Sequence, residues 1–124
     1  MEDLANSPAF GELVVEFTRQ SKPVAALCHG PAALLPARDA GGWLFRGRRV
    51  TGFTNAEEEQ VGFADKAPWR LEDRLLEDGG AFESSGNPWR PHVVVDGNLY
   101  SGQNPASSEP LAKQLLTAIV SAHA

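Results

Sequence analysis

The sequence predicts an α/β domain, a three-layer sandwich in which helices cover both faces of a mainly parallel sheet. Two observations lead to this prediction. Short apolar runs of strand length alternate along the chain with longer stretches in which apolar residues recur at helical spacing. One run, residues 23–27, is apolar throughout, as is typical of a parallel strand buried on both faces. Because the strand candidates are few for such a sheet, we expect strands to be missing on one side.

Length, composition and charge narrow the class of protein. The 124 residues correspond to a single domain. With 42% hydrophobic and 22% charged residues, the chain has the composition of a folded protein rather than a disordered one. The formal net charge of −5 argues against a nucleic-acid-binding surface, because the most basic cluster, residues 46–49, is explained as a solvated turn.

The sequence contains no membrane-span, metal-site or disulfide signal. No apolar stretch approaches the roughly 20 residues of a membrane span, and the acidic N-terminal residues do not resemble a signal peptide. A single cysteine cannot form an internal disulfide, so we expect a cytoplasmic protein. The scattered histidines and cysteine have no metal-ligand spacing, and we expect no bound metal.

The first helix is predicted over residues 9–20, after a loop-like start. Ser7 is a typical N-cap residue, and Pro8 suits the first helical position. Apolar residues at spacings of three and four predict one buried face on this helix. The members of that face are Phe10, Leu13, Val14 and Phe17.

A second helix is predicted to begin near Gly30. Pro36 should kink it or end it early, because a proline inside a helix costs about 3 kcal/mol. Residues 49–53 are the next strand candidate. Thr54 is a cap-type residue followed by acids, which predicts a short helix that reaches about Phe63.

A third amphipathic helix is predicted over residues 69–78, and residues 81–84 form a short extended piece. The leucines expected to point inward from this helix are Leu71, Leu75 and Leu76.

The C-terminal part is predicted to form a hairpin and a final helix. Residues 92–95 and 99–101 flank an Asp-Gly turn, which is the sequence signature of a β-hairpin. Ser107 or Ser108 caps the last helix. Its expected buried residues are Leu111, Leu115, Leu116, Ile119 and Val120.

The segment KPVAALCHGP, residues 22–31, is the best candidate for a reactive site. An apolar strand runs directly into Cys28, the single cysteine, which is followed by His29 and then by small residues that open a helix. This order is typical of a nucleophile elbow, in which a sharp turn presents one side chain at the carboxyl end of a sheet. The N-terminus of the following helix would lower the pKa of the Cys28 thiol.

Structural interpretations of the same residues remain open. A lone cysteine after an apolar strand is often a small buried hydrophobic residue. A histidine beside a helix start often only caps the helix or contacts backbone, so His29 has this alternative too. The acidic run at Glu57, Glu58 and Glu59 would by default be a solvated first turn of its helix.

Three motifs, in the same order along the chain, resemble one known family. They are Ala26–Pro31, Val50–Glu58, and Pro91–Leu99 together with Gly102–Ser108. All three are similar to the PfpI-like superfamily within the class I glutamine amidotransferase-like fold. The greatest resemblance is to its heat-shock chaperone and glyoxalase III branch, which is related to the protein deglycases. The resemblance implies a mainly parallel, flavodoxin-like sheet.

The resemblance also implies a site and a chemistry. Cys28 matches the family nucleophile and His29 the histidine of the catalytic triad. Glu58 fits the third member best, with Glu57 and Glu59 as the alternatives. Members of the branch act without cofactors on small dicarbonyls such as methylglyoxal, so we expect this substrate class and no cofactor. Glutaminase activity is not expected, because His123 lacks the glutamate that would accompany it two residues away.

The chain departs from the family pattern at its N-terminal side. The pattern begins with roughly half a domain that these residues do not contain, including the first strands and a loop that helps to form the oxyanion hole. We therefore expect a partial domain, residues 1–124, whose exposed sheet is covered in a homodimer or by a partner chain. A non-catalytic, chaperone-like interaction module is the alternative to a glyoxalase III or deglycase-type enzyme.

Overall fold

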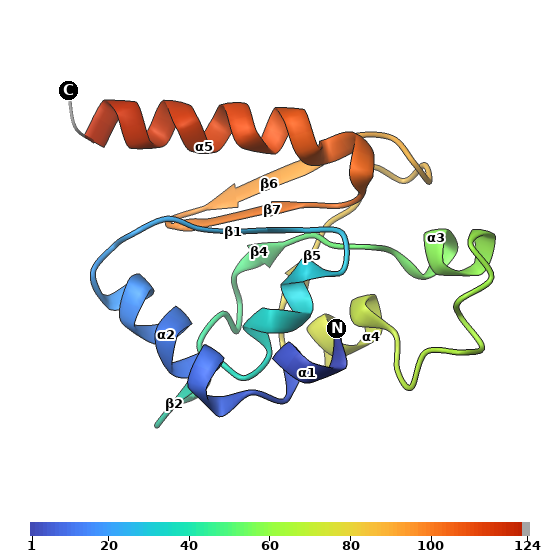
Figure 1. Ribbon diagram of the computed structural model, residues 1–124, viewed down its shortest axis with the longest axis horizontal. Coiled ribbons are helices and arrows are strands. Elements are labelled where there is room, and N and C mark those ends of the chain that lie inside the picture. Colours follow the sequence, from blue (N-terminus) through green and yellow to red (C-terminus); the bar gives the residue numbers. More distant parts are fainter. Residues whose placement is uncertain (123–124) are drawn as a thin grey trace.

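A sheet of short strands lies between two layers of helices (Figure 1). The computed structural model describes residues 1–122, so His123 lies outside the described residues. The elements in chain order are α1 (Glu2–Ala5), α2 (Pro8–Arg19), β1 (Val24–Leu27), the 3₁₀ helix η1 (Gly30–Leu34), β2 (Arg38–Asp39), β3 (Gly42–Trp43), β4 (Arg49–Val50), α3 (Asn55–Gln60), α4 (Leu71–Glu77), β5 (Ala81–Phe82), β6 (Val93–Asp96), β7 (Leu99–Gly102), the 3₁₀ helix η2 (Pro105–Ser107) and α5 (Ser108–Ala122).

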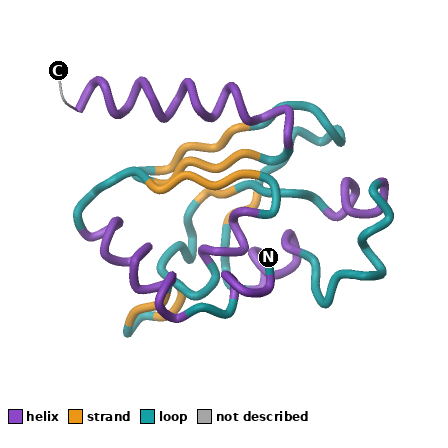
Figure 2. Tube along the Cα trace, viewed as in Figure 1, coloured by secondary structure: helices purple, strands orange, loops and turns teal. Residues whose placement is uncertain are grey.

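The central sheet has the strand order β1-β7-β6. β1 runs parallel to β7, with Val24 opposite Leu99 and Leu27 opposite Gly102, whereas β6 and β7 form the antiparallel hairpin. Helix α5 covers one face of the sheet, and α1, α2 and α4 lie on the other side (Figure 1, Figure 2). The α/β sandwich prediction is confirmed. Parallel pairing joins segments distant in sequence, and antiparallel pairing occurs within hairpins.

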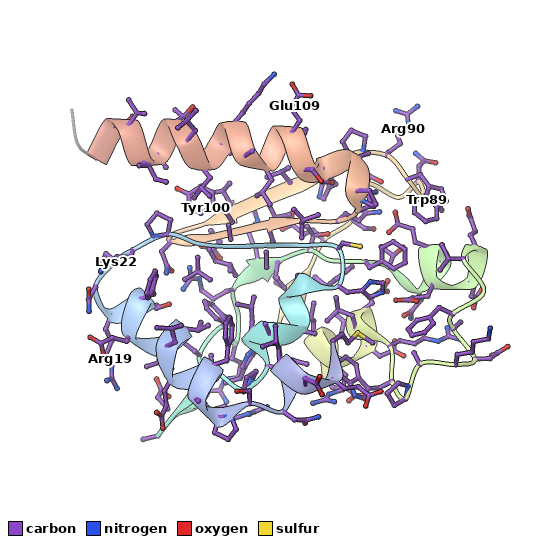
Figure 3. The ribbon with its side chains drawn as sticks, in the orientation of Figure 1. Arg19, Lys22, Trp89, Arg90, Tyr100 and Glu109 are labelled. Carbon is purple, nitrogen blue, oxygen red and sulfur yellow. The ribbon has the colours of Figure 1, made fainter. Side chains whose placement is uncertain are left out.

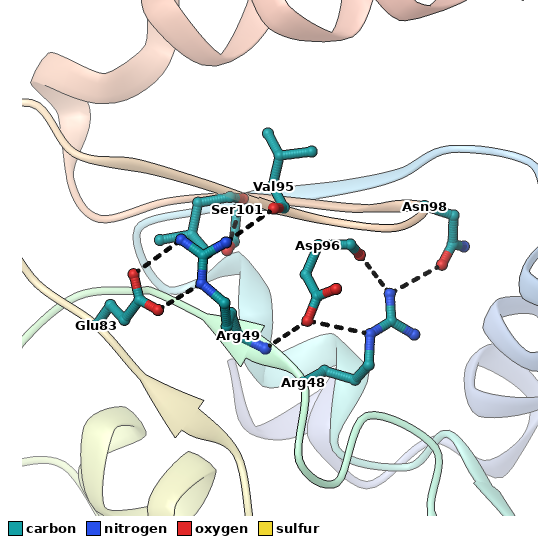
Figure 4. Close-up of polar contacts among 8 residues, drawn as sticks. Arg48, Arg49, Glu83, Val95, Asp96, Asn98 and Ser101 are labelled. Atoms are coloured by element: carbon teal, nitrogen blue, oxygen red, sulfur yellow. Dashed lines mark hydrogen bonds and ion pairs between the residues drawn. The ribbon is translucent and has the colours of Figure 1, made fainter.

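A second parallel pair, β4 with β5, is attached to the central sheet by charged side chains (Figure 4). The backbone N–H of Arg49 donates to the Asp96 carboxylate at 2.8 Å, and Arg49 Nε donates to Glu83 at 2.6 Å. Arg48 donates to the backbone carbonyl of Asp96 and forms an ion pair with its carboxylate at 3.4 Å. Two residues of the basic cluster, Arg48 and Arg49, therefore join the two sheets.

The apolar core fills the space between the sheet and the layer that holds η1. Trp43 is buried there and donates from Nε1 to the carbonyl of Leu34 at 2.8 Å. Gly11 of α2 packs against the backbone that follows η1, because a Cβ at this position would lie 2.2 Å from the Pro36 carbonyl oxygen. The largest fully buried apolar side chains are Phe45, Leu34, Leu35, Leu71, Leu75, Leu99, Val50 and Val94.

Several predicted elements differ from the structure in kind or length. The loop expected at the N-terminus contains α1, whose first turn holds two acids, as a helix start prefers. The helix expected after Cys28 is the short 3₁₀ helix η1, which ends just before Pro36, in line with the early end predicted from that proline. The hairpin of β2 and β3 in the Gly41-Gly42 region was not predicted.

The remaining differences lie at element ends. The strand predicted over residues 49–53 is regular only at Arg49–Val50, and the helix predicted to reach Phe63 ends at Gln60. Helix α4 spans Leu71–Glu77, which is shorter than the helix predicted over residues 69–78. Element ends depend on hydrogen bonds to distant segments, which local patterns do not report.

The predicted burial of the helix faces is wrong in part. Val14 and Leu111 are buried, but Leu13 and Leu116 have exposed fractions of 49% and 62%. The strand predicted to be buried on both faces is β1, an edge strand in which no residue is fully buried and Ala25 is exposed. A sheet of three strands is too narrow to cover the apolar faces of these helices. Other apolar side chains predicted to be inward and found exposed are Phe17, Leu76, Ile119 and Val120.

Candidate functional site

Cys28 lies at the carboxyl end of β1 in a sharp turn. Its φ is +60°, in the left-handed region that non-glycine residues rarely adopt. The turn is held from both sides: the Cys28 N–H donates to the Gly102 carbonyl at 3.0 Å, and the Cys28 carbonyl accepts from the Phe53 N–H at 2.8 Å. A left-handed conformation of this kind persists only where the surroundings fix it. The backbone therefore has the geometry of a nucleophile elbow.

His29 lies between the cysteine and a buried carboxylate. Cys28 Sγ is 3.7 Å from His29 Nδ1, and His29 Nε2 is hydrogen-bonded to Glu58 Oε1. An ionised carboxylate only accepts hydrogen bonds, so the proton of a neutral imidazole is then on Nε2. Nδ1 is left with its lone pair directed at the thiol, which is the tautomer that a general base needs.

Helix α3 supplies the carboxylate and distinguishes the three glutamates. Thr54 and Glu57 form a capping box at its start, as the sequence predicts for Thr54 as the cap. Glu58 has an exposed fraction of 0% and contacts His29, whereas Glu59 is exposed and pairs with Arg70 at 3.3 Å. Glu57 is equally buried but turns away from His29. The interpretation of this run as a solvated turn is therefore wrong for Glu57 and Glu58.

The electrostatics at Cys28 differ from the sequence-based expectation. Burial raises the pKa of the Cys28 thiol, a hydrogen bond with the His29 backbone lowers it by less, and the negative charges of Glu57 and Glu58 raise it further. The expected lowering by a helix N-terminus is wrong, because η1 is a single short 3₁₀ helix with little aligned dipole. The raised pKa disfavours the thiolate, so proton removal has to accompany attack by this thiol near neutral pH.

Two aromatic rings lie beside His29. The centroid of the Phe53 ring lies 4.5 Å from that of His29, and that of Phe63 lies 6.3 Å away. Trp89 packs edge-on against Phe53 at 5.5 Å. A hollow beside His29 is lined by Met1, Glu2, His29, Phe63 and Pro68.

Sequence reasoning did not single out these rings as parts of the site, and it considered Glu57 only as an alternative to Glu58. For Phe53, its place at the end of a predicted strand, directly before the Thr54 cap, was the available signal. For Glu57, the capping-box spacing from Thr54 indicated a side chain that folds back on the helix start.

Within residues 1–122, no group of three or more histidine, cysteine, aspartate or glutamate side chains is placed to hold a metal ion. Of the helices in this range, none has the length and apolar character needed to cross a membrane.

The fold and the site together define the class: an α/β sandwich that carries a Cys-His pair and a buried carboxylate at a strand-end elbow. The chain belongs to the DJ-1/PfpI family, whose family model matches residues 1–118. This agrees with the resemblance carried by the three sequence motifs.

Curated relatives match along most of this chain. The glutamine amidotransferase-like class 1 domain-containing protein 1 of Bos taurus is 39% identical over 116 residues, covering 92% of this chain and 52% of the relative. A glutathione-independent glyoxalase of Saccharomyces cerevisiae is 33% identical over 102 residues, covering 77% of this chain and 43% of the relative. The chain spans about half the length of the curated relatives it matches.

A solved structure of Rapid Encystment Protein (24 kDa) from Francisella tularensis superposes with a TM-score of 0.88 at 35% identity. The match covers 91% of this chain and 50% of that one. Glyoxalase III from Candida albicans superposes with a TM-score of 0.86 at 26% identity, covering 94% and 51%.

Proposed function

We propose that this chain carries the reactive half of a cofactor-independent glyoxalase III or deglycase-type site that converts small dicarbonyls, such as methylglyoxal, into hydroxyacids. The observation that carries the proposal is the line of contacts from Cys28 Sγ through His29 to buried Glu58. Relatives named as glutathione-independent glyoxalases support the choice of reaction.

In the first step Cys28 adds to the aldehyde carbon of the dicarbonyl. The S–C bond forms while the π bond of the carbonyl breaks, and the thiol proton passes to His29 Nδ1 at the same time. Because the pKa of the thiol is raised, this transfer is needed for attack near neutral pH. The imidazolium then protonates the new alkoxide and gives a hemithioacetal. Glu58 holds the ring and stabilises its transient positive charge.

The second step moves hydrogen within the substrate. A proton leaves the carbon bonded to sulfur and a proton is added to the neighbouring carbonyl carbon, through an enediol. The first carbon reaches the oxidation level of a thioester and the second that of an alcohol, so no external oxidant or reductant takes part. Water then hydrolyses the thioester, the S–C bond breaks, the thiol recovers its proton and the hydroxyacid is released.

The test is lactate formation from methylglyoxal by the purified chain. We expect turnover that Cys28→Ser abolishes. Glu58→Gln should lower kcat/KM by about a hundredfold, the lower range for loss of acid-base catalysis. Glu59→Gln is the matched control, because Glu59 is adjacent in sequence but exposed and turned away from His29. Turnover that survives in the Cys28→Ser variant would refute the proposed nucleophile.

A second candidate function is a chaperone-like interaction module, favoured by the exposed apolar surface. A groove between α2 and the open edge of β1 is lined by apolar residues, among them Leu13 and Phe17. On the opposite face of the sheet, α5 exposes Leu116 and Val120. An unpaired strand edge between two apolar helix faces is suited to a second copy of the chain or a partner chain that continues the sheet.

A further inference from the structure

Glu57 is a buried carboxylate to which the proposed reaction assigns no role. Its exposed fraction is 0%, and it forms no ion pair with any described residue. Its side chain instead accepts five hydrogen bonds. Oε1 accepts from Thr54 N at 3.1 Å, Thr54 Oγ1 at 2.9 Å and Gln103 Nε2 at 3.1 Å, and Oε2 accepts from Trp89 N at 2.9 Å and Asn104 Nδ2 at 2.8 Å.

These bonds join three segments that are distant in sequence. Thr54 caps α3, Trp89 belongs to the loop before β6, and Gln103 and Asn104 follow β7. Figure 3 shows Trp89 and Arg90 in this loop, at the end of the sheet near α3. The backbone of Trp89 has φ +68°, in the left-handed region, and its N–H points to Glu57.

The groups that donate to the Glu57 carboxylate, from Thr54, Trp89, Gln103 and Asn104, form a cage around it. Trp89 connects this cage to the candidate site. Its ring lies 5.5 Å from Phe53, and the Phe53 ring lies 4.5 Å from His29. The Trp89 ring therefore contacts the ring that packs against the imidazole. Glu57 accepts the hydrogen bond from the backbone N–H of Trp89 in this loop.

The cage is built for a carboxylate rather than an amide. Four of the five bonds come from N–H groups, two on each carboxylate oxygen. A glutamine would have to turn its own NH₂ group toward one of these pairs, which leaves donors facing donors. Burial by itself raises the pKa of Glu57, but hydrogen bonds from Asn104, Trp89 and Thr54 outweigh burial and lower the pKa below its ordinary value.

We propose that Glu57 is a positioning residue, which as a buried anion fixes the Trp89 loop. Through this loop it fixes the aromatic wall against His29, which consists of the Trp89 and Phe53 rings. The relevance of this wall to turnover rests on the proposed function. The role of Glu57 in holding the loop does not rest on the proposed function, because it concerns only the loop, the rings and the environment of the thiol. The negative charge of Glu57 also adds to the raised pKa of the Cys28 thiol, so loss of the charge is expected to be felt at Cys28.

The test is a double-mutant cycle on the full chain with Glu57→Gln, Gln103→Glu and the combined variant. Gln103 Nε2 donates to Glu57, and Gln103 Oε1 accepts from Ser85 N at 3.0 Å. The combined variant therefore keeps a carboxylate and an amide in contact with their roles exchanged. Glu59→Gln is the control, with the same change in charge at an exposed position.

Two measurements, amide hydrogen exchange and cysteine alkylation, test the hydrogen bonds of Glu57 and do not depend on enzymatic turnover. Hydrogen exchange of the Trp89 amide, followed by NMR, should be about tenfold faster in Glu57→Gln, as expected for loss of a hydrogen bond to a charged acceptor. The pH midpoint of Cys28 alkylation should fall in the same variant, because a nearby negative charge is removed. Gln103→Glu should also speed Trp89 exchange, since two carboxylates then face each other.

The combined variant should recover most of the Trp89 protection and move the alkylation midpoint back up, a non-additive result. Recovery is incomplete because Thr54 N still meets an amide. The proposal is overturned if Glu57→Gln changes Trp89 exchange no more than Glu59→Gln does. If Glu57→Gln does not fold, a combined variant that folds no better than either single variant overturns it.

Lactate formation adds a third measurement that rests on the proposed function. We expect Glu57→Gln to lower kcat/KM and the combined variant to restore part of it. If the parent chain forms no lactate while the exchange and alkylation results hold, the proposed reaction fails and the role of Glu57 stands.

Discussion

The conformation of Cys28 makes a prediction that can be tested without any knowledge of the reaction. Alanine and glycine are to be compared at position 28, where φ is +60°. A left-handed conformation costs a non-glycine residue roughly 1–2 kcal/mol, and glycine avoids this cost. Glycine in turn loses about 0.5–1 kcal/mol more than alanine in backbone entropy. The difference between the midpoints of these two ranges predicts that Cys28→Gly is more stable than Cys28→Ala by about 0.75 kcal/mol.

The matched comparison uses Ala26, two residues earlier in β1, where the backbone is an ordinary strand. There Ala26→Gly should destabilise the protein by about 1 kcal/mol, because entropy and a lost methyl contact act in the same direction. The assay is urea unfolding with the slope held in common across variants. The reasoning is refuted if glycine at position 28 costs as much as glycine at position 26, since the turn would then carry no strain.

Two further predictions concern the thiol and the exposed helix faces. At pH 7 iodoacetamide should alkylate Cys28 more slowly than it alkylates a small-molecule thiol, and the half-maximal rate should lie at higher pH. The reason is that burial raises the pKa of the Cys28 thiol and leaves less thiolate. A midpoint at or below that of the free thiol would contradict this prediction. If a second copy of the chain covers α5, light scattering should give the mass of a dimer, and Leu116→Lys should reduce it to that of a monomer. Gln114→Lys is the control, because Gln114 is exposed on the same helix and its substitution should leave the dimer intact. A monomer mass at every concentration would exclude self-association.

Local patterns predicted the parts of the fold that local interactions form. Ser7 caps α2 and accepts the Phe10 N–H at 3.2 Å, as its position before Pro8 predicts. The Asp-Gly turn forms the β6–β7 hairpin, with Gly97 at φ +60°. These features depend on residues within a few positions of each other, so the sequence is sufficient to predict them.

The exposed helix faces show where local reasoning fails. The spacing of Leu13 and Phe17 identified an apolar face correctly, and the face is nonetheless open. Periodicity reports which side of a helix is apolar, but burial depends on whether another element lies against that side. The width of the sheet, which no local pattern encodes, decided the outcome for α2 and α5.

By itself, the sequence determined the α/β class, the strand that runs into Cys28-His29 and a short acidic helix that follows Thr54. Only the tertiary structure decided which carboxylate meets the imidazole, because that contact joins residues 29 positions apart. It also decided the direction of the shift in the thiol pKa, since burial and the charges of α3 raise this pKa and η1 is too short to supply an opposing helix dipole. Adjacent residues are fixed by covalent geometry, whereas the electrostatics of a site are set by groups that only folding brings together.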